Sequence, residues 1–197
     1  MRLLLFGTAL AHEEDGYQPS RYNLANAYLH ASIRSVFKDN LLQVRRLDQS
    51  VDLANACHNG VDPTGEILAW NPNIVGLSCY VWDYGANMAL ARRLKSQRSD
   101  ILVIAGGPEV SVAPRAVLEE NPAVDVAVYG EGEETIVELL KAPPRDFSGI
   151  RGLVWRREDQ IIIDEGKRDT SHDLSGLASP LLSGVLVPPD ESLYFLF

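Results

Sequence analysis

Three short segments carry most of the residues in this chain whose types and spacing could do chemistry. They are residues 78–84 (Ser-Cys-Tyr-Val-Trp-Asp-Tyr), residues 106–111 (Gly-Gly-Pro-Glu-Val-Ser) and residues 130–135 (Gly-Glu-Gly-Glu-Glu-Thr). Each segment follows or ends a run of aliphatic residues of strand length. In open α/β sheets, ligands bind outside the carboxyl ends of the strands. The three segments therefore predict one binding site, built from consecutive strand ends.

The first two segments suit a flat ligand that approaches the backbone closely. The aromatic rings of Tyr80 and Trp82 can stack on such a ligand, and Ser78 offers a hydroxyl group. The paired glycines of the second segment leave room for close approach, and Pro108 stiffens the turn that follows them. Simpler interpretations stay open, because the aromatic residues could belong to the core and Gly-Gly-Pro is common in turns.

The third segment offers hydrogen-bond acceptors in a flexible loop. Glu131, Glu133 and Glu134 would repel a phosphate group, and no lysine follows as it does in a P-loop. Hydroxyl or amide groups are better partners. Acidic residues in a first helical turn also stabilise the helix by about 0.3–1 kcal/mol each, so helix capping is the open alternative.

Composition excludes several other functions. The chain has 197 residues, and 18 Lys and Arg against 27 Asp and Glu give a net charge of −9, which disfavours nucleic acid as a partner. The two cysteines, Cys57 and Cys79, cannot by themselves fill a zinc site or hold an iron–sulfur cluster, so no metal ligands are expected here. No apolar run is long enough to span a membrane. Acidic residues follow residues 1–7 where a signal peptide needs a cleavage site, which predicts a cytoplasmic protein.

The elements that must position these segments alternate between strands and helices, which is typical of a parallel sheet with helices on its faces. A hairpin without an intervening helix follows them, whereas residues 51–70 allow two short helices at best. We therefore predict a flavodoxin-like (Rossmann-like), doubly wound, five-stranded parallel sheet with an appended β-hairpin. Strands are expected at residues 2–8, 41–47, 74–81, 101–105 and 124–129, helices from about Ser20 to 37, around 90–94, from Pro114 to before Pro122 and around 136–140, and the hairpin at 152–163.

The predicted domain organisation has three parts. Residues 1–145 form the binding domain, residues 146–168 the hairpin, and residues 169–197 a linker rich in Ser, Gly and Pro. The linker ends in an apolar, strand-like run at 192–197. Because exposed apolar residues are costly, we expect this run to be the first strand of a further domain.

In their amino-acid sequences and in their order along the chain, the three segments resemble the strand-end loops of the amino-terminal cobalamin-binding domain of cobalamin-dependent radical S-adenosylmethionine (radical SAM) enzymes. The resemblance covers about residues 1–197. It implies that the corrin packs against the aromatic and aliphatic residues, and that its amide arms and the ribose meet the polar ones. The residues expected to contact cobalamin are Thr8, Ser78, Cys79, Tyr80, Val81, Trp82, Gly106, Gly107, Pro108, Glu109, Val110, Gly130, Glu131, Gly132 and Glu133.

The resemblance also implies what lies beyond this domain. A carboxyl-terminal radical SAM domain of the same chain, with a [4Fe-4S] cluster and S-adenosylmethionine, would act on a small-molecule substrate by methyl transfer or other radical chemistry. The cysteine motif of such a domain does not occur in these 197 residues. This segment is therefore expected to position cobalamin and not to be catalytic alone.

One loop departs from a pattern common among cobalamin domains. Many of them carry Asp-x-His-x-x-Gly after the first strand, and its histidine is the lower axial ligand of cobalt. Here Leu10 stands at the aspartate position, and Gly16 lies four residues after His12 instead of three. Without a carboxylate to orient it, His12 is expected to be a surface residue, as is His172 in the linker. Cobalamin would then be held without a histidine ligand.

Two other interpretations use the same fold. A receiver-like signalling domain would need acidic residues after the first strand, where Thr8, Ala9 and Leu10 stand, although Asp83 is available as a phosphoacceptor. A flavin- or nucleotide-binding module is supported by the glycines alone.

Overall fold

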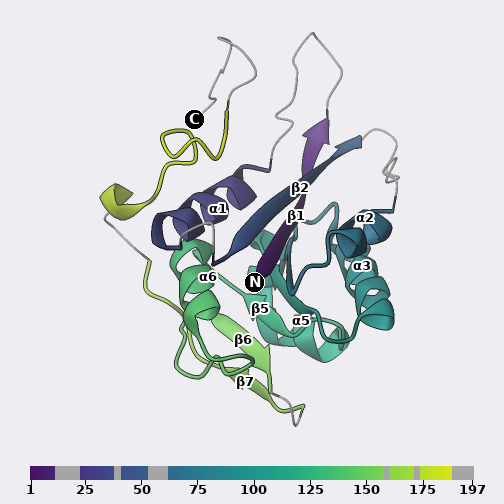
Figure 1. Ribbon diagram of the computed structural model, residues 1–197. Coiled ribbons are helices and arrows are strands. Elements are labelled where there is room, and N and C mark those ends of the chain that lie inside the picture. The colour runs from purple at the N-terminus through teal and green to yellow at the C-terminus, as the bar shows by residue number, and fades with distance from the viewer. Residues whose placement is uncertain (12–22, 38–40, 53–61, 158–159, 171–173, 188–197) are drawn as a thin grey trace.

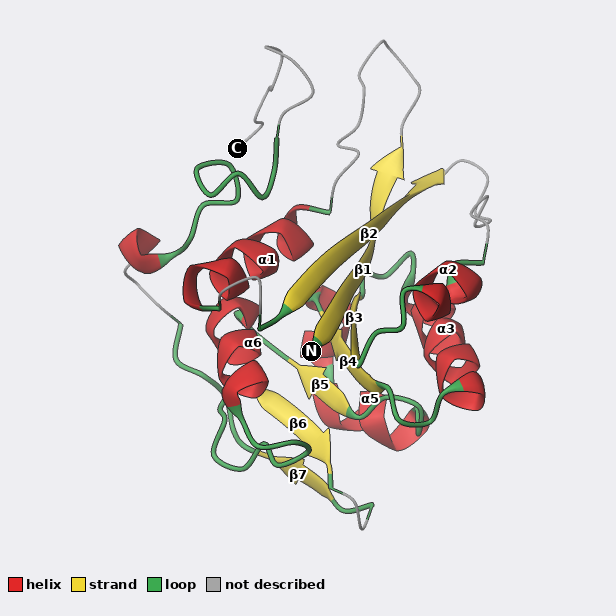
Figure 2. Cartoon of the chain, viewed as in Figure 1, coloured by secondary structure: helices red, strands yellow, loops and turns green. Residues whose placement is uncertain are grey.

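The computed structural model describes residues 1–11, 23–37, 41–52, 62–157, 160–170 and 174–187. Seven strands form one sheet in the order β2-β1-β3-β4-β5-β6-β7 (Figure 2). The first five strands pair in parallel, and β6 and β7 are antiparallel. The prediction of a flavodoxin-like parallel sheet with an appended hairpin is confirmed. The strands are β1 (Arg2–Ala11), β2 (Gln43–Asp52), β3 (Ile74–Ser78), β4 (Leu102–Gly106), β5 (Val126–Val128), β6 (Leu153–Arg156) and β7 (Ile162–Asp164).

Helices cover both faces of the sheet (Figure 1). On one face, α1 and α6 pack with a core cluster that includes Leu3, Leu5 and Ile104. On the other face, α2, α3 and α5 pack with a second cluster that includes Leu4 and Phe6. The helices are α1 (Leu24–Val36), α2 (Thr64–Ala69), α3 (Tyr84–Gln97), α4 (Pro108–Val112), α5 (Pro114–Glu120) and α6 (Gly132–Lys141), with a 3-10 turn at Leu174–Gly176.

The central strand β1 shows why the parallel strands of the sheet have continuous apolar sequences. Leu3, Leu4, Leu5 and Phe6 are each at most 4% exposed, because successive side chains enter the two opposite core clusters. Each buried leucine stabilises the fold by roughly 1.5–3 kcal/mol. The sheet therefore has a rigid centre, and its carboxyl-terminal edge can carry loops.

Some predicted boundaries differ from the structure. The strands expected at 74–81 and 124–129 end earlier, at Ser78 and Val128, because the residues that follow form loops at the sheet edge. β2 is longer than expected and continues through Arg45 and Arg46, which an edge strand tolerates. The first helix is capped by Asn23, and the predicted cap Ser20 lies outside the described residues, as do His12, His172 and the run 192–197.

The hairpin continues the same sheet. β6 pairs antiparallel with β5, and Trp155 is 1% exposed. The indole ring of Trp155 meets Phe147 edge to face at 5.5 Å, and its Nε1 donates to Glu165 at 3.0 Å. The hairpin thus shares the core cluster that contains α1 and α6. Within the described residues, no helix combines the length and apolar character needed to cross a bilayer.

Candidate functional site

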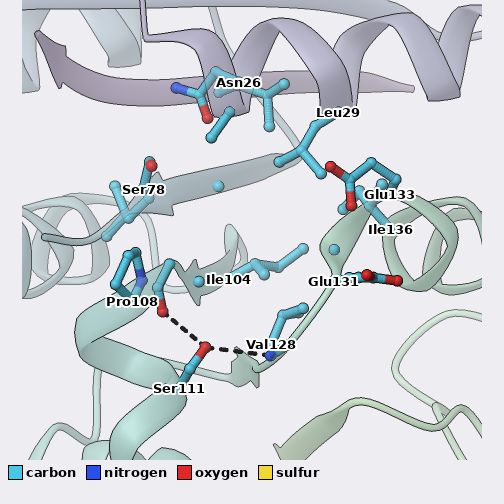
Figure 3. Close-up of a pocket in the computed structure, with 18 of the residues that line it drawn as sticks. Asn26, Leu29, Ser78, Ile104, Pro108, Ser111, Val128, Glu131, Glu133 and Ile136 are labelled. Atoms are coloured by element: carbon cyan, nitrogen blue, oxygen red, sulfur yellow. Dashed lines mark hydrogen bonds between the residues drawn. The ribbon is translucent and has the colours of Figure 1, made fainter. Parts of the chain in front are cut away.

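A cavity of about 420 Å³ opens between α1 and α6 at the carboxyl ends of the parallel strands (Figure 3). Its floor includes Leu5, Gly76 and Ile104, which are neighbours across β1, β3 and β4. Leu29 of α1 and Ile136 of α6 contribute walls. The remaining lining residues are Ala25, Asn26, Leu77, Ser78, Tyr80, Gly106, Gly107, Pro108, Ser111, Val128, Gly130, Glu131, Gly132 and Glu133.

All three segments singled out in the sequence meet at this cavity. Each comes from the end of a different strand, so the parallel topology brings together residues more than 50 positions apart. The expected contact residues that line the cavity are Ser78, Tyr80, Gly106, Gly107, Pro108, Gly130, Glu131, Gly132 and Glu133.

The other expected contact residues lie away from the cavity lining. Cys79 and Val110 are fully buried in the core cluster on the opposite face of the sheet, and the packing of Val110 against a corrin stays a prediction that this burial does not support. Burial also raises the pKa of the Cys79 thiol, which therefore stays protonated near neutral pH. The remaining expected contacts outside the lining are Thr8, Val81, Trp82 and Glu109.

The buried carboxylate of Asp83 organises the loop after β3. It accepts hydrogen bonds from the backbone N–H of Tyr80, at 2.7 Å, and from the hydroxyl group of Thr8. Trp82 Nε1 donates to Thr8 Oγ1 at 3.1 Å, and the Trp82 ring stacks on Tyr80 with 4.7 Å between centroids and 7° between planes. Thr8 and Trp82 therefore support the loop, Tyr80 lines the cavity, and the side chain of Val81 is 75% exposed.

The loops after β3 and β4 are joined through their backbones. Cys79 N–H donates to Gly106 C=O at 2.7 Å, and Glu109 N–H donates to Cys79 C=O at 3.3 Å. Gly107 has φ of +109°, and a Cβ atom there would lie 2.5 Å from the Cys79 carbonyl oxygen. Only glycine fits this crossing of two backbones.

Ser111 connects the second loop to the third. Its hydroxyl group donates to the Gly107 carbonyl at 3.0 Å and accepts from the Gly130 N–H at 3.2 Å (Figure 3). Hydrogen bonds therefore link the loop after β3 to the loop after β4, and the loop after β4 to the loop after β5. The sequence marked Ser111 as part of a segment, but not as a residue of the site.

Asn26 is a second polar residue of the cavity that sequence reasoning missed. Asn26 is 1% exposed, and its side-chain amide nitrogen is buried. The neighbouring cap residue Asn23 accepts from the Asn26 N–H at 3.0 Å and donates to Thr8 C=O at 3.1 Å. The single signal in the sequence was a pair of asparagines at a helix start, which normally indicates capping alone.

Asp48 on β2 lies beside the Asn26 amide. Burial raises the pKa of this carboxyl group, although the charge of Arg46 and hydrogen bonds from Asn26 and Asn23 act in the opposite direction. A raised carboxyl pKa in the folded state lowers stability as pH rises through that pKa, since the folded state must then release its proton.

We therefore expect Asp48→Asn to be more stable than wild type at pH 7, with the difference shrinking as the pH falls toward 4. Urea unfolding followed by circular dichroism across this range measures it. A variant that is less stable at pH 7 than at pH 4, relative to wild type, would contradict this assignment.

The cavity combines apolar walls with acidic residues and lacks positive charge. No lysine, arginine or histidine is among the described lining residues, whereas Glu131 and Glu133 are. In the described part of the chain, no group of three or more His, Cys, Asp and Glu side chains is placed to hold a metal ion. The cavity thus suits a neutral, largely apolar group accompanied by hydroxyl or amide groups.

Comparisons with known proteins bear on this site. The model of the B12 binding domain matches residues 30–140, a span that runs from α1 to α6 and so covers most of the cavity. The cobalamin-dependent radical SAM methyltransferase TokK of Streptomyces tokunonensis is 35% identical over 118 residues, which are 58% of this chain and 17% of that protein.

Two further relatives are methyltransferases by name. The 2-(S-pantetheinyl)-carbapenam-3-carboxylate methyltransferase of Streptantibioticus cattleyicolor is 44% identical over 107 residues, which are 52% of this chain and 16% of that protein. An uncharacterised methyltransferase of Pyrococcus horikoshii is 31% identical over 127 residues, which are 64% of this chain and 27% of that protein. The matched region thus spans about a sixth of the length of the first two relatives and about a quarter of the third.

Proposed function

Because the chain belongs to the B12-binding domain family, we propose that it holds cobalamin over the carboxyl ends of β3, β4 and β5, with the nucleotide tail in the cavity between α1 and α6. The observation that carries this proposal is the convergence of three sequence segments on one cavity. The family match covers the same part of the chain. Receiver-like and flavin-binding alternatives are not favoured by any of these matches.

The cavity fits a flat, apolar base. Gly76 and Gly106 add no side chains to the cavity, while Leu29 and Ile136 contribute apolar walls. A Cβ atom on Gly132 would lie 3.2 Å from Leu29 Cδ2, so the close approach of α1 and α6 depends on this glycine. Apolar walls with few polar groups are typical of small-molecule sites.

The polar residues of the site suit the outer parts of the cofactor. Glu131 and Glu133 would accept hydrogen bonds from ribose hydroxyls or corrin amides, and their charge requires the phosphodiester of the nucleotide tail to lie away from them. Tyr80, held flat by Trp82, offers an aromatic face next to the corrin. When bound, cobalamin supplies a cobalt centre that can carry a methyl group; these residues bind and orient it.

Attachment without a histidine ligand is part of this proposal. No histidine is found among the described lining residues, and His12 lies outside the described part of the chain. Because Leu10 stands where a carboxylate would orient His12 as a ligand, His12→Ala should leave cobalamin affinity within about twofold of wild type.

The names of the relatives support a larger assignment. The whole protein is a cobalamin-dependent radical SAM enzyme, with methyl transfer as its reaction class and a small molecule as its substrate. Its [4Fe-4S] cluster and S-adenosylmethionine would bind to a radical SAM domain of the same chain. This segment contributes the position and surroundings of cobalamin.

Retention of cobalamin tests the proposal. The 197-residue chain is incubated with hydroxocobalamin, passed through a gel-filtration column and examined by its visible spectrum. A corrin spectrum at close to one equivalent in the protein peak is expected for wild type and for His12→Ala. Protein that emerges without corrin at micromolar concentration would overturn the proposal.

A further inference from the structure

Arg168 follows β7 and binds several groups around α6. Its Nε donates to Thr135 Oγ1 at 3.0 Å, and its Nη2 donates to the Arg151 carbonyl at 3.2 Å. Its guanidinium group also pairs with Glu134, at 3.2 Å, and with Glu138. The Arg168 side chain is 16% exposed, which is low for an arginine on the outer segment of a sheet. Because the guanidinium group makes several hydrogen bonds and ion pairs at once, it restrains α6 more firmly than a single exposed ion pair would.

Thr135 connects this contact to the cavity. The residue is fully buried, and its hydroxyl group lies 3.3 Å from the Glu131 carbonyl oxygen. When the Thr135 oxygen accepts from Arg168, its hydroxyl hydrogen can be donated to the Glu131 carbonyl or to the Arg151 carbonyl, which lies 3.4 Å away. The cavity is lined by Glu131, Gly132 and Glu133, so Arg168 acts two hydrogen bonds away from it.

The loop before α6 is held in part by its neighbours, since the Gly130 N–H donates to Ser111 Oγ at 3.2 Å. The helix cap, Glu131, makes no side-chain capping hydrogen bond. Gly130 on one side has φ of +75°, and Gly132 lies on the other. Glycines on both sides give the backbone wide conformational freedom, which the contact of Thr135 with the Glu131 carbonyl restricts.

We propose that Arg168 is a positioning residue for the α6 side of the cavity. Through Thr135 it holds residues 131–133 in the arrangement that accepts the nucleotide tail of cobalamin. The inference rests on the proposed function, since it assumes that the tail enters this cavity. It makes the segment that follows the hairpin part of the binding site, although none of that segment's described residues lines the cavity.

Comparison of cobalamin with cobinamide, which lacks the nucleotide tail, tests this role. In Arg168→Gln we expect cobalamin to bind about tenfold more weakly than to wild type, while cobinamide affinity stays within about twofold. Arg168→Lys should be intermediate, because one ammonium group can pair with a glutamate but cannot make all of the guanidinium contacts. Titration of the 197-residue chain, followed by visible absorbance, gives both dissociation constants.

Arg115→Gln is the matched control. Arg115 lies on α5, pairs with Glu119 and donates to the Ile162 carbonyl of the hairpin at 3.4 Å, but it does not line the cavity. Both ligands should bind this variant like wild type. Equal losses of cobalamin and cobinamide in Arg168→Gln, or no loss of either, would overturn the role of Arg168. Wild type that fails to bind cobalamin would overturn the proposed function instead.

Discussion

Gly107→Ala is expected to lower the free energy of unfolding by at least about 3 kcal/mol and to abolish cobalamin retention. A residue with a side chain at φ of +109° costs roughly 1–3 kcal/mol. In addition, the new Cβ would lie 2.5 Å from the Cys79 carbonyl oxygen and 2.9 Å from its nitrogen, so two backbone segments must separate. Urea unfolding followed by circular dichroism measures the first effect, and gel filtration with hydroxocobalamin measures the second.

Gly149→Ala separates the cost of backbone strain at positive φ from the cost of steric overlap of the added Cβ atom. Gly149 has φ of +79°, but no atom lies within 4 Å of its added Cβ, and it does not line the cavity. This variant should lose about 1 kcal/mol and keep its cobalamin. If the two variants were equally stable, the tight crossing of the loops after β3 and β4 would not be a feature of the protein in solution.

Gly106→Val is expected to weaken cobalamin binding by at least about 100-fold while the fold remains intact. Gly106 ends β4 and lines the cavity, and its added Cβ would make ordinary contacts with Val128, at 3.6 Å from the carbonyl oxygen and 3.7 Å from Cβ. The valine methyl groups then occupy space that the nucleotide base needs. A β-branched residue is well suited to a strand, so we expect stability within about 1 kcal/mol of wild type.

The control for this substitution is Gly65→Val on α2. This residue is exposed, has no atom within 4 Å of its added Cβ and does not line the cavity. Its cobalamin affinity should equal that of wild type in the same absorbance titration. Retained affinity in Gly106→Val, within threefold of wild type, would place the nucleotide tail elsewhere.

The sequence was sufficient for the fold class and for the loops of the site because both depend on local patterns. Three aliphatic runs mark the strands that precede the segments 78–84, 106–111 and 130–135, and parallel topology brings the ends of such strands to one edge of a sheet. The hairpin was equally clear, since two strand-like runs flank a short polar turn.

Side-chain direction within the loops was not predictable in the same way. Val110 and Ser111 are adjacent in α4, yet Val110 points into the core and Ser111 lines the cavity. Which of the two faces a ligand depends on how α4 packs against β4 and β5, and no local pattern encodes that packing. Asp83 raised a similar difficulty, because its partner Thr8 lies 75 positions away.

The walls of the cavity were also beyond sequence reasoning. Asn26 and Ile136 line it from helices that follow the first and the fifth strand of the chain. Each reads as an ordinary helix residue, and the space between them exists only because α1 and α6 lie on one face of the sheet (Figure 1). Long-range placement of this kind needs the tertiary structure.

The visible spectrum of bound methylcobalamin at neutral pH tests the central claim most directly. A nucleotide base that occupies the cavity between α1 and α6 cannot also coordinate cobalt, so titration of the 197-residue chain should convert the base-on spectrum to the base-off spectrum. We predict a saturable change at close to one equivalent, which Gly106→Val lacks. Bound methylcobalamin that keeps its base-on spectrum, or protein that binds no corrin, would contradict the account.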